Sequence, residues 1–216
     1  MEHVYGTNPA NPNNPANPAN PVASDNPNNQ ADSDSQANRQ ESLPQPAHAV
    51  DAGRAFAIRH PEALHIEDET GARFLGCEQE WYGSLWQRRA GCGPTVASNM
   101  MLYLHRTGAL QLPFDVTGKT GCLQLMNAMW NHVTPSPRGV NSVRRFADGL
   151  HAFSERYGYR MDCASILYPK ATMKRPSFPE VVSFIADGLV LDCPIGFLNL
   201  SSGDVTNLDS WHWVTL

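Results

Sequence analysis

The chain has 216 residues and a formal net charge of −5, enough for one globular domain with a substantial core and a tail. The mild acidity argues against nucleic-acid binding, which needs a basic surface. No apolar run is long enough for a membrane span, and the N-terminus lacks the basic and apolar regions of a secretory signal. The five cysteines form no C-x-x-C pair, which favours free thiols, a cytoplasmic location and no zinc site.

The first 48 residues differ in composition from the rest of the chain. They are rich in Asn, Ala and Ser, and prolines recur at every third position at Pro9, Pro12, Pro15, Pro18 and Pro21. Such a segment cannot bury enough apolar surface to offset its conformational entropy. Residues 1–48 are therefore predicted to be a disordered tail, and residues 49–216 the folded domain.

No element is predicted over residues 51–75, where apolar and charged side chains alternate without a clear period. A helix is predicted from Gly91 onward. Pro94 suits the first turn, apolar residues then recur with helical period up to Arg106, and Gly108 can end the helix. This places Cys92 at the helix N-terminus.

Three more helices are predicted further along. One covers residues 122–133 and ends before Pro135. The next covers residues 143–157, with Asn141 as a possible N-cap and Gly158 as the stop. The last begins at the capping box that starts at Ser177 and continues to Leu189.

Two strands are predicted after these helices. Residues 194–200 and 211–216 have the character of strands, and Ser201-Ser202-Gly203-Asp204 between them is a turn signal, so the strands should pair antiparallel. Helices followed by a sheet indicate an α+β fold.

A cysteine at a helix N-terminus can become a nucleophile, because the helix dipole and free N–H groups favour the thiolate. It needs a base, and the candidates are His60, His65, His105, His132, His151 and His212. His105 is about 20 Å away along the same helix, too far to pair. Strand alternation puts His212 on the face of the strand opposite Trp211 and Trp213. We expect the face that carries His212 to be the inner one. The alternatives are a buried structural cysteine and a core histidine.

Taken together, Gly91-Cys92-Gly93-Pro94-Thr95 and Trp211-His212-Trp213-Val214-Thr215 resemble the papain-like cysteine peptidases. Within that superfamily they are most similar to the bacterial branch that includes the bacteriocin leader-processing peptidases. The resemblance covers roughly residues 78–216. It implies a papain-like α+β fold, with the Cys on a central helix and the His on a later antiparallel sheet.

The resemblance also implies roles for individual residues. Cys92 would be the nucleophile, His212 its base and then the acid, and Gln79 or Gln87 the side-chain donor to the oxyanion. The family's third residue, an Asp or Asn on the strand after the His, has no counterpart before Leu216. This indicates a domain that is incomplete at its C-terminal end. Asp209 could assist His212 only by breaking the family order.

The predicted function is hydrolysis of peptide or amide bonds through an acyl-enzyme, on a peptide or protein substrate and without cofactor or metal. Acyl transfer to an amine is a second hypothesis on the same fold. A third is a catalytically inactive binding module whose peptide groove would be lined by aromatic side chains, at Trp81, Trp86, Trp211 and Trp213.

Overall fold

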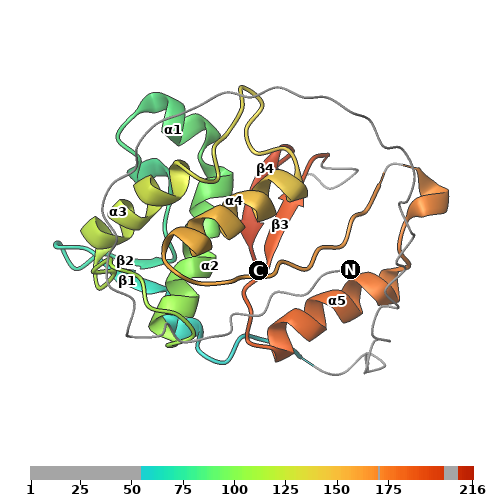
Figure 1. Ribbon diagram of the computed structural model, residues 1–216, viewed down its shortest axis with the longest axis horizontal. Coiled ribbons are helices and arrows are strands. Elements are labelled where there is room, and N and C mark those ends of the chain that lie inside the picture. Colours follow the sequence, from blue (N-terminus) through green and yellow to red (C-terminus); the bar gives the residue numbers. More distant parts are fainter. Residues whose placement is uncertain (1–54, 170, 202–208) are drawn as a thin grey trace, which may run out of the picture.

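The computed structural model describes residues 55–169, 171–201 and 209–216. The predicted tail and most of the predicted turn after Ser201 lie outside the described residues. Helices and two small antiparallel sheets make up the described chain, so the coarse prediction of an α+β fold is confirmed. Figure 1 shows α2 in the middle of the helical part, with α1 above it and α5 at the edge of the molecule.

The central helix is α2, Cys92–Arg106, as predicted. Every residue from 92 to 104 is buried, because α3, α1, β4 and a 3₁₀ helix at Pro61–Leu64 all pack against α2. The sequence indicated a single apolar stripe, but the helix is enclosed on all sides. Gly108 has a φ of +79°, which suits the predicted stop because glycine adopts this conformation without strain.

The other predicted helices are α3 (Lys119–Trp130), α4 (Val143–Arg156) and α5 (Phe178–Val190). The predicted N-cap of α4 is wrong. The Ser142 side chain, and not Asn141, accepts the hydrogen bond from the backbone N–H of Arg145. The capping box of α5 is present as predicted.

The sequence predicted no element where the structure has a hairpin and a short helix. The hairpin pairs β1 (His65–Glu67) with β2 (Arg73–Leu75), and α1 is Leu85–Ala90. Two further 3₁₀ turns are Gln79–Trp81 and Thr172–Lys174. The hairpin turn had a readable signal: the Asp68 carboxylate accepts from the N–H groups of Thr70 and Ala72, as Asp often does in turns.

The second sheet pairs β3 (Gly196–Asn199) with β4 (His212–Thr215), antiparallel as predicted, with Asn199 opposite His212. Mutual backbone bonds between Ile195 and Leu216 extend the pairing. The sheet packs on α2 at Gly196, where an added Cβ would lie 3.2 Å from the Val96 side chain. A side chain at position 196 would therefore be tight against α2, and glycine allows this close approach of β3.

Candidate active site

Cys92 is the first residue of α2 and is 8% exposed. Its placement depends on Gly91, because a Cβ there would lie 2.4 Å from the carbonyl oxygen of Gln87 and 2.7 Å from the Tyr82 ring. The Tyr82 hydroxyl donates to the carbonyl of Met126 on α3, which fixes the ring. The bend at Gly91 therefore brings the end of α1 against the thiol end of α2.

The N-terminus of α2 has no side-chain cap. The N–H groups of Cys92 and Gly93 have no backbone acceptor in the described part of the chain, and Pro94 has no N–H. Uncapped N–H groups at a helix N-terminus attract negative charge. This end of α2 can therefore stabilise a thiolate or a developing oxyanion.

Strand β4 begins beside the start of α2. The indole N–H of Trp213 donates to the carbonyl of Val140 at 2.5 Å. The Val140 side chain also lies against Gly93, where an added Cβ would come within 2.8 Å of it. Val140 thus lies between the second residue of α2 and the second residue of β4.

A second contact lies further along both elements. The Asn99 amide donates to the Thr215 hydroxyl at 3.3 Å. The seven residues from Cys92 to Asn99 rise about 10 Å in a helix, and the three from His212 to Thr215 span about 10 Å in a strand. Helix α2 and strand β4 therefore run in the same direction (Figure 1), so both elements begin at the same end of this contact.

The inner face of β4 is occupied by Trp213, which is 3% exposed and stacks on Phe146 with ring centroids 4.2 Å apart. His212 is half-buried and alternates to the other face. The expectation that His212 faces inward is therefore wrong, because the large indole fills the core in its place. Neither the Cys92 thiol nor the His212 ring makes a hydrogen bond to another described residue.

The two candidate glutamines point to different neighbours. The Gln79 amide donates to the carbonyl of Arg88, close to the end of α1 that leads into Cys92. The Gln87 amide donates to Asn127 on α3 at 3.3 Å, and its oxygen accepts from Ser84. Gln79 is thus fixed beside the bend before α2, whereas Gln87 helps to join α1 to α3.

Sequence reasoning missed Asn99, which joins three segments. Besides its bond to Thr215, its side-chain oxygen accepts from the backbone N–H of Cys77 at 2.6 Å. Gly76 packs directly on the amide, where an added Cβ would lie 2.9 Å from the oxygen. A buried amide within an apolar helix is the signal that could have identified it.

Asn199 was also missed. It is buried, lies opposite His212 in the sheet, and donates to the backbone carbonyl of Asp209 at 2.5 Å. Its oxygen accepts from the N–H of Ser201. The Asn199 side chain therefore fixes the backbone on both sides of the connection that leads to His212. Asp209, the other sequence candidate for a partner of His212, takes part through its carbonyl.

The four tryptophans expected to line a peptide groove do not form one cluster. Trp213 is in the core, while Trp86 and Trp211 are 47% and 56% exposed. Trp81 is half-buried and packs edge-on against Phe74. Trp213 is therefore a core residue, whereas the side chains of Trp86 and Trp211 are accessible at the surface.

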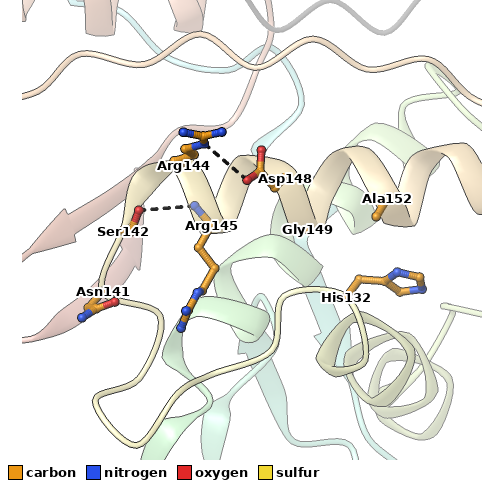
Figure 2. A pocket seen from close by; sticks show the side chains of 8 residues that line it. All are labelled: His132, Asn141, Ser142, Arg144, Arg145, Asp148, Gly149 and Ala152. Atoms are coloured by element: carbon orange, nitrogen blue, oxygen red, sulfur yellow. Dashed lines mark hydrogen bonds and ion pairs between the residues drawn. The ribbon is translucent and has the colours of Figure 1, made fainter. Parts of the chain in front are cut away.

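A cavity of about 410 Å³ lies elsewhere, beside the N-terminal half of α4 (Figure 2). Its lining includes the charged residues Arg144, Arg145 and Asp148 from α4 and His132 from the turn after α3. It is not lined by Cys92 or His212. No group of three or more potential metal ligands is found within the described ranges.

Comparison of the chain with protein-family models, curated proteins and solved structures gives no match. None of the helices in the described ranges is long and apolar enough to cross a membrane.

Proposed function

We propose that this protein is a papain-like cysteine peptidase that cleaves peptide or amide bonds, with Cys92 as nucleophile and His212 as base. The observation that carries the proposal is the parallel course of α2 and β4, which brings the start of the His212 strand to the Cys92 end of the helix. A thiol and an imidazole brought together there would have the chemistry for acyl transfer through a thioester.

The uncapped first turn of α2 supports the same proposal. The attack of the Cys92 thiolate on a carbonyl carbon creates an oxyanion, and the Cys92 N–H is free to donate to it. Of the two candidate side-chain donors, Gln79 is favoured by its place beside the bend that precedes Cys92. Its amide has a second N–H for the oxyanion while the first binds the Arg88 carbonyl.

The cycle follows from these roles. His212 takes the thiol proton, the thiolate adds to the carbonyl, and His212 then returns the proton to the leaving amine as the C–N bond breaks. Water, deprotonated by His212, releases the acid and restores the thiol. Asn199 is a positioning residue, because its hydrogen bond to Asp209 holds the chain three residues before His212.

A second candidate is a peptide-binding module without catalysis. It is favoured by the outward face of His212 and by the exposed Trp86 and Trp211, which can pack on a peptide chain. The two candidate functions predict different fates for a peptide: a binding module would bind it and leave it intact, whereas a peptidase would cleave it into fragments.

The rate of alkylation tests the peptidase directly. We expect iodoacetamide at near-neutral pH to modify Cys92 faster than Cys163 or Cys193, although both of these are more exposed. Peptide mapping of time points gives the rate at each thiol. Equal or slower reaction at Cys92 would exclude an activated nucleophile.

Incubation with a peptide library, analysed by mass spectrometry, is the second test of the peptidase proposal. The peptidase predicts new termini that disappear in Cys92→Ala and persist in the matched control Cys163→Ala. Fast alkylation without cleavage, together with a new amide product when an amine is added, would identify a transferase.

A further inference from the structure

The cavity beside α4, here called the α4 cavity, lies between two parts of the chain that are held close together. Helix α4 packs on the turn after α3 at Gly149, where an added Cβ would lie 2.8 Å from the carbonyl oxygen of His132. Asn141 and Ser142, which lead into α4, contribute to the wall. The volume of about 410 Å³ is in the range of small-ligand sites, so the α4 cavity has room for a small molecule or a single side chain.

The charges that line the α4 cavity leave one positive charge in excess. Arg144 pairs with Asp148, with 3.8 Å between Nε and Oδ2. Figure 2 shows the Arg145 side chain extending away from this pair, on the side of α4 where Asn141 and His132 lie. The Arg145 guanidinium makes no ion pair or hydrogen bond with another described residue. Its planar set of N–H groups is therefore free to bind a carboxylate through two parallel hydrogen bonds.

Two uncharged side chains accompany Arg145. Burial, and to a lesser extent the charge of Arg156, lowers the pKa of His132, so its ring is neutral at pH 7 and donates through one nitrogen. The ring lies edge-on against Phe153, with centroids 5.5 Å apart. The Asn141 amide lies at the other end of the cavity in Figure 2. A singly charged anion with several acceptor positions matches this set of groups.

The α4 cavity is also close to the place where α2 and β4 meet. Asn141, in its wall, follows Val140 directly. The Val140 side chain lies against Gly93, and its carbonyl accepts from the Trp213 indole. The cavity therefore begins one residue along the chain from this junction. An extended peptide advances about 3.3 Å per residue, so a few residues of peptide span such an interval.

We propose that the α4 cavity binds the carboxylate of a Glu or Asp side chain in a peptide whose scissile bond lies at Cys92. Arg145 supplies the charge and the paired hydrogen bonds, and His132 and Asn141 supply neutral donors. That the carboxylate belongs to a peptide rests on the proposed function. Binding of a carboxylate in the cavity rests only on the groups that line it.

The carboxylate site is tested with two probes of the same shape, N-acetylglutamic acid α-amide and N-acetylglutamine α-amide. Each is titrated into the full chain and followed by heteronuclear NMR. We expect the acid to shift the signals of His132 and Gly149 and to bind at least about 10-fold more tightly than the amide, because hydrogen bonds to a charged group are the stronger ones. Arg145→Ala should abolish this preference and Arg145→Lys should restore part of it. Arg160→Ala, at an exposed arginine that does not line the cavity, is the matched control and should keep it. Equal affinity for the two probes, or an unchanged preference in Arg145→Ala, would overturn the proposal.

Peptides separate the outcomes for the cavity from those for the peptidase. A library in which each Glu-containing peptide has a partner with Gln at the same position is bound to Cys92→Ala, which leaves the peptides intact, and is incubated with the unchanged protein. We expect tighter binding of the Glu peptides that is lost in Cys92→Ala/Arg145→Ala. A preference for the small acid without one for the Glu peptides would overturn the assignment to a peptide. Preferred binding without any cleavage would refute the peptidase and support the carboxylate site. Cleavage that is equal for Glu and Gln peptides and unchanged in Arg145→Ala would support the peptidase and overturn the role of the cavity.

Discussion

Helices α2 and α5 are both rich in apolar side chains, yet they are stabilised in different ways. Helix α5 begins with a complete capping box, in which the Ser177 N–H donates to Glu180 at 2.6 Å and the Ser177 side chain accepts in return. Its contact with the rest of the molecule is limited: its buried residues are Ser183 and Ala186, and Phe178 is 80% exposed. The interactions that define its start are local.

Helix α2 has no such cap, and its anchors are side chains that reach distant segments. Asn99 binds Cys77 and Thr215, Tyr103 binds the Asp192 carboxylate, and Arg106 donates to four backbone carbonyls. Because these bonds and its enclosure hold α2, its N-terminal N–H groups need no cap. The N-terminal end of a helix can stay uncapped when tertiary contacts replace local ones.

The largest effect is expected at that open end. Cys92→Ala should reduce peptide cleavage by about 10⁴-fold or more, because the nucleophile is lost. The free energy of unfolding should fall by only about 1 kcal/mol, since a single small apolar group is removed from the core. Steady-state cleavage and urea unfolding measure the two. Equal cleavage by Cys92→Ala and the unchanged protein would contradict the proposal that the uncapped end of α2 carries the nucleophile.

The next effect concerns the distant anchors of α2. Asn99→Ala leaves the Cys77 N–H and the Thr215 hydroxyl without their partner, and the free energy of unfolding should fall by about 2–4 kcal/mol. Urea unfolding gives the value. Asn127→Ala, an exposed amide on α3, is the matched control and should cost less than about 1 kcal/mol. Similar losses in both variants would show that the Asn99 contacts do not stabilise α2.

Tyr103 gives a third, pH-dependent prediction. Burial, with the hydrogen bond to Asp192, raises its pKa from the ordinary value of 10 to about 12. The unfolded chain then loses this proton from about pH 10 upward while the folded chain keeps it. The contribution of Tyr103 is therefore complete below about pH 10 and declines as pH rises towards about 12, by at most about 1.4 kcal/mol per pH unit.

The measurement is urea unfolding of the protein and of Tyr103→Phe from about pH 8 to about pH 11. Burial raises the pKa of Tyr82 as well, but that residue is unchanged in both proteins and cancels in their difference. The stability of Tyr103→Phe should decline less steeply above about pH 10. Parallel curves would mean that Tyr103 titrates alike in the folded and unfolded chains.

The parts of the fold that sequence could predict are those with local causes. The Ser177 capping box, the stop at Gly108 and the apolar period of α2 each act within a few residues, and these elements were predicted. The β1–β2 hairpin was missed because its strands are only three residues long and have no clear alternation. The N-cap of α4 fell one residue later than predicted, at Ser142.

The candidate site divides in the same way. Cys92 at a helix N-terminus follows from Pro94 and the helical period. The face of His212 could not be predicted, because alternation fixes which residues share a face but not which face is inside. The size of Trp213 decides that. Asn99 and Asn199 were missed because their partners are brought to them only by the fold.

The smallest effect is expected at the start of α5. Ser177→Ala removes the acceptor for the Glu180 N–H, and the free energy of unfolding should fall by about 1 kcal/mol, without change in Cys92 alkylation. Urea unfolding and peptide mapping are the measurements, with the exposed Ser165→Ala as the control. If Ser177→Ala lowered the free energy of unfolding as much as Asn99→Ala, or slowed Cys92 alkylation, then α5 would be coupled to the uncapped end of α2. The contrast between a locally capped helix and a tertiary-anchored one would then fail.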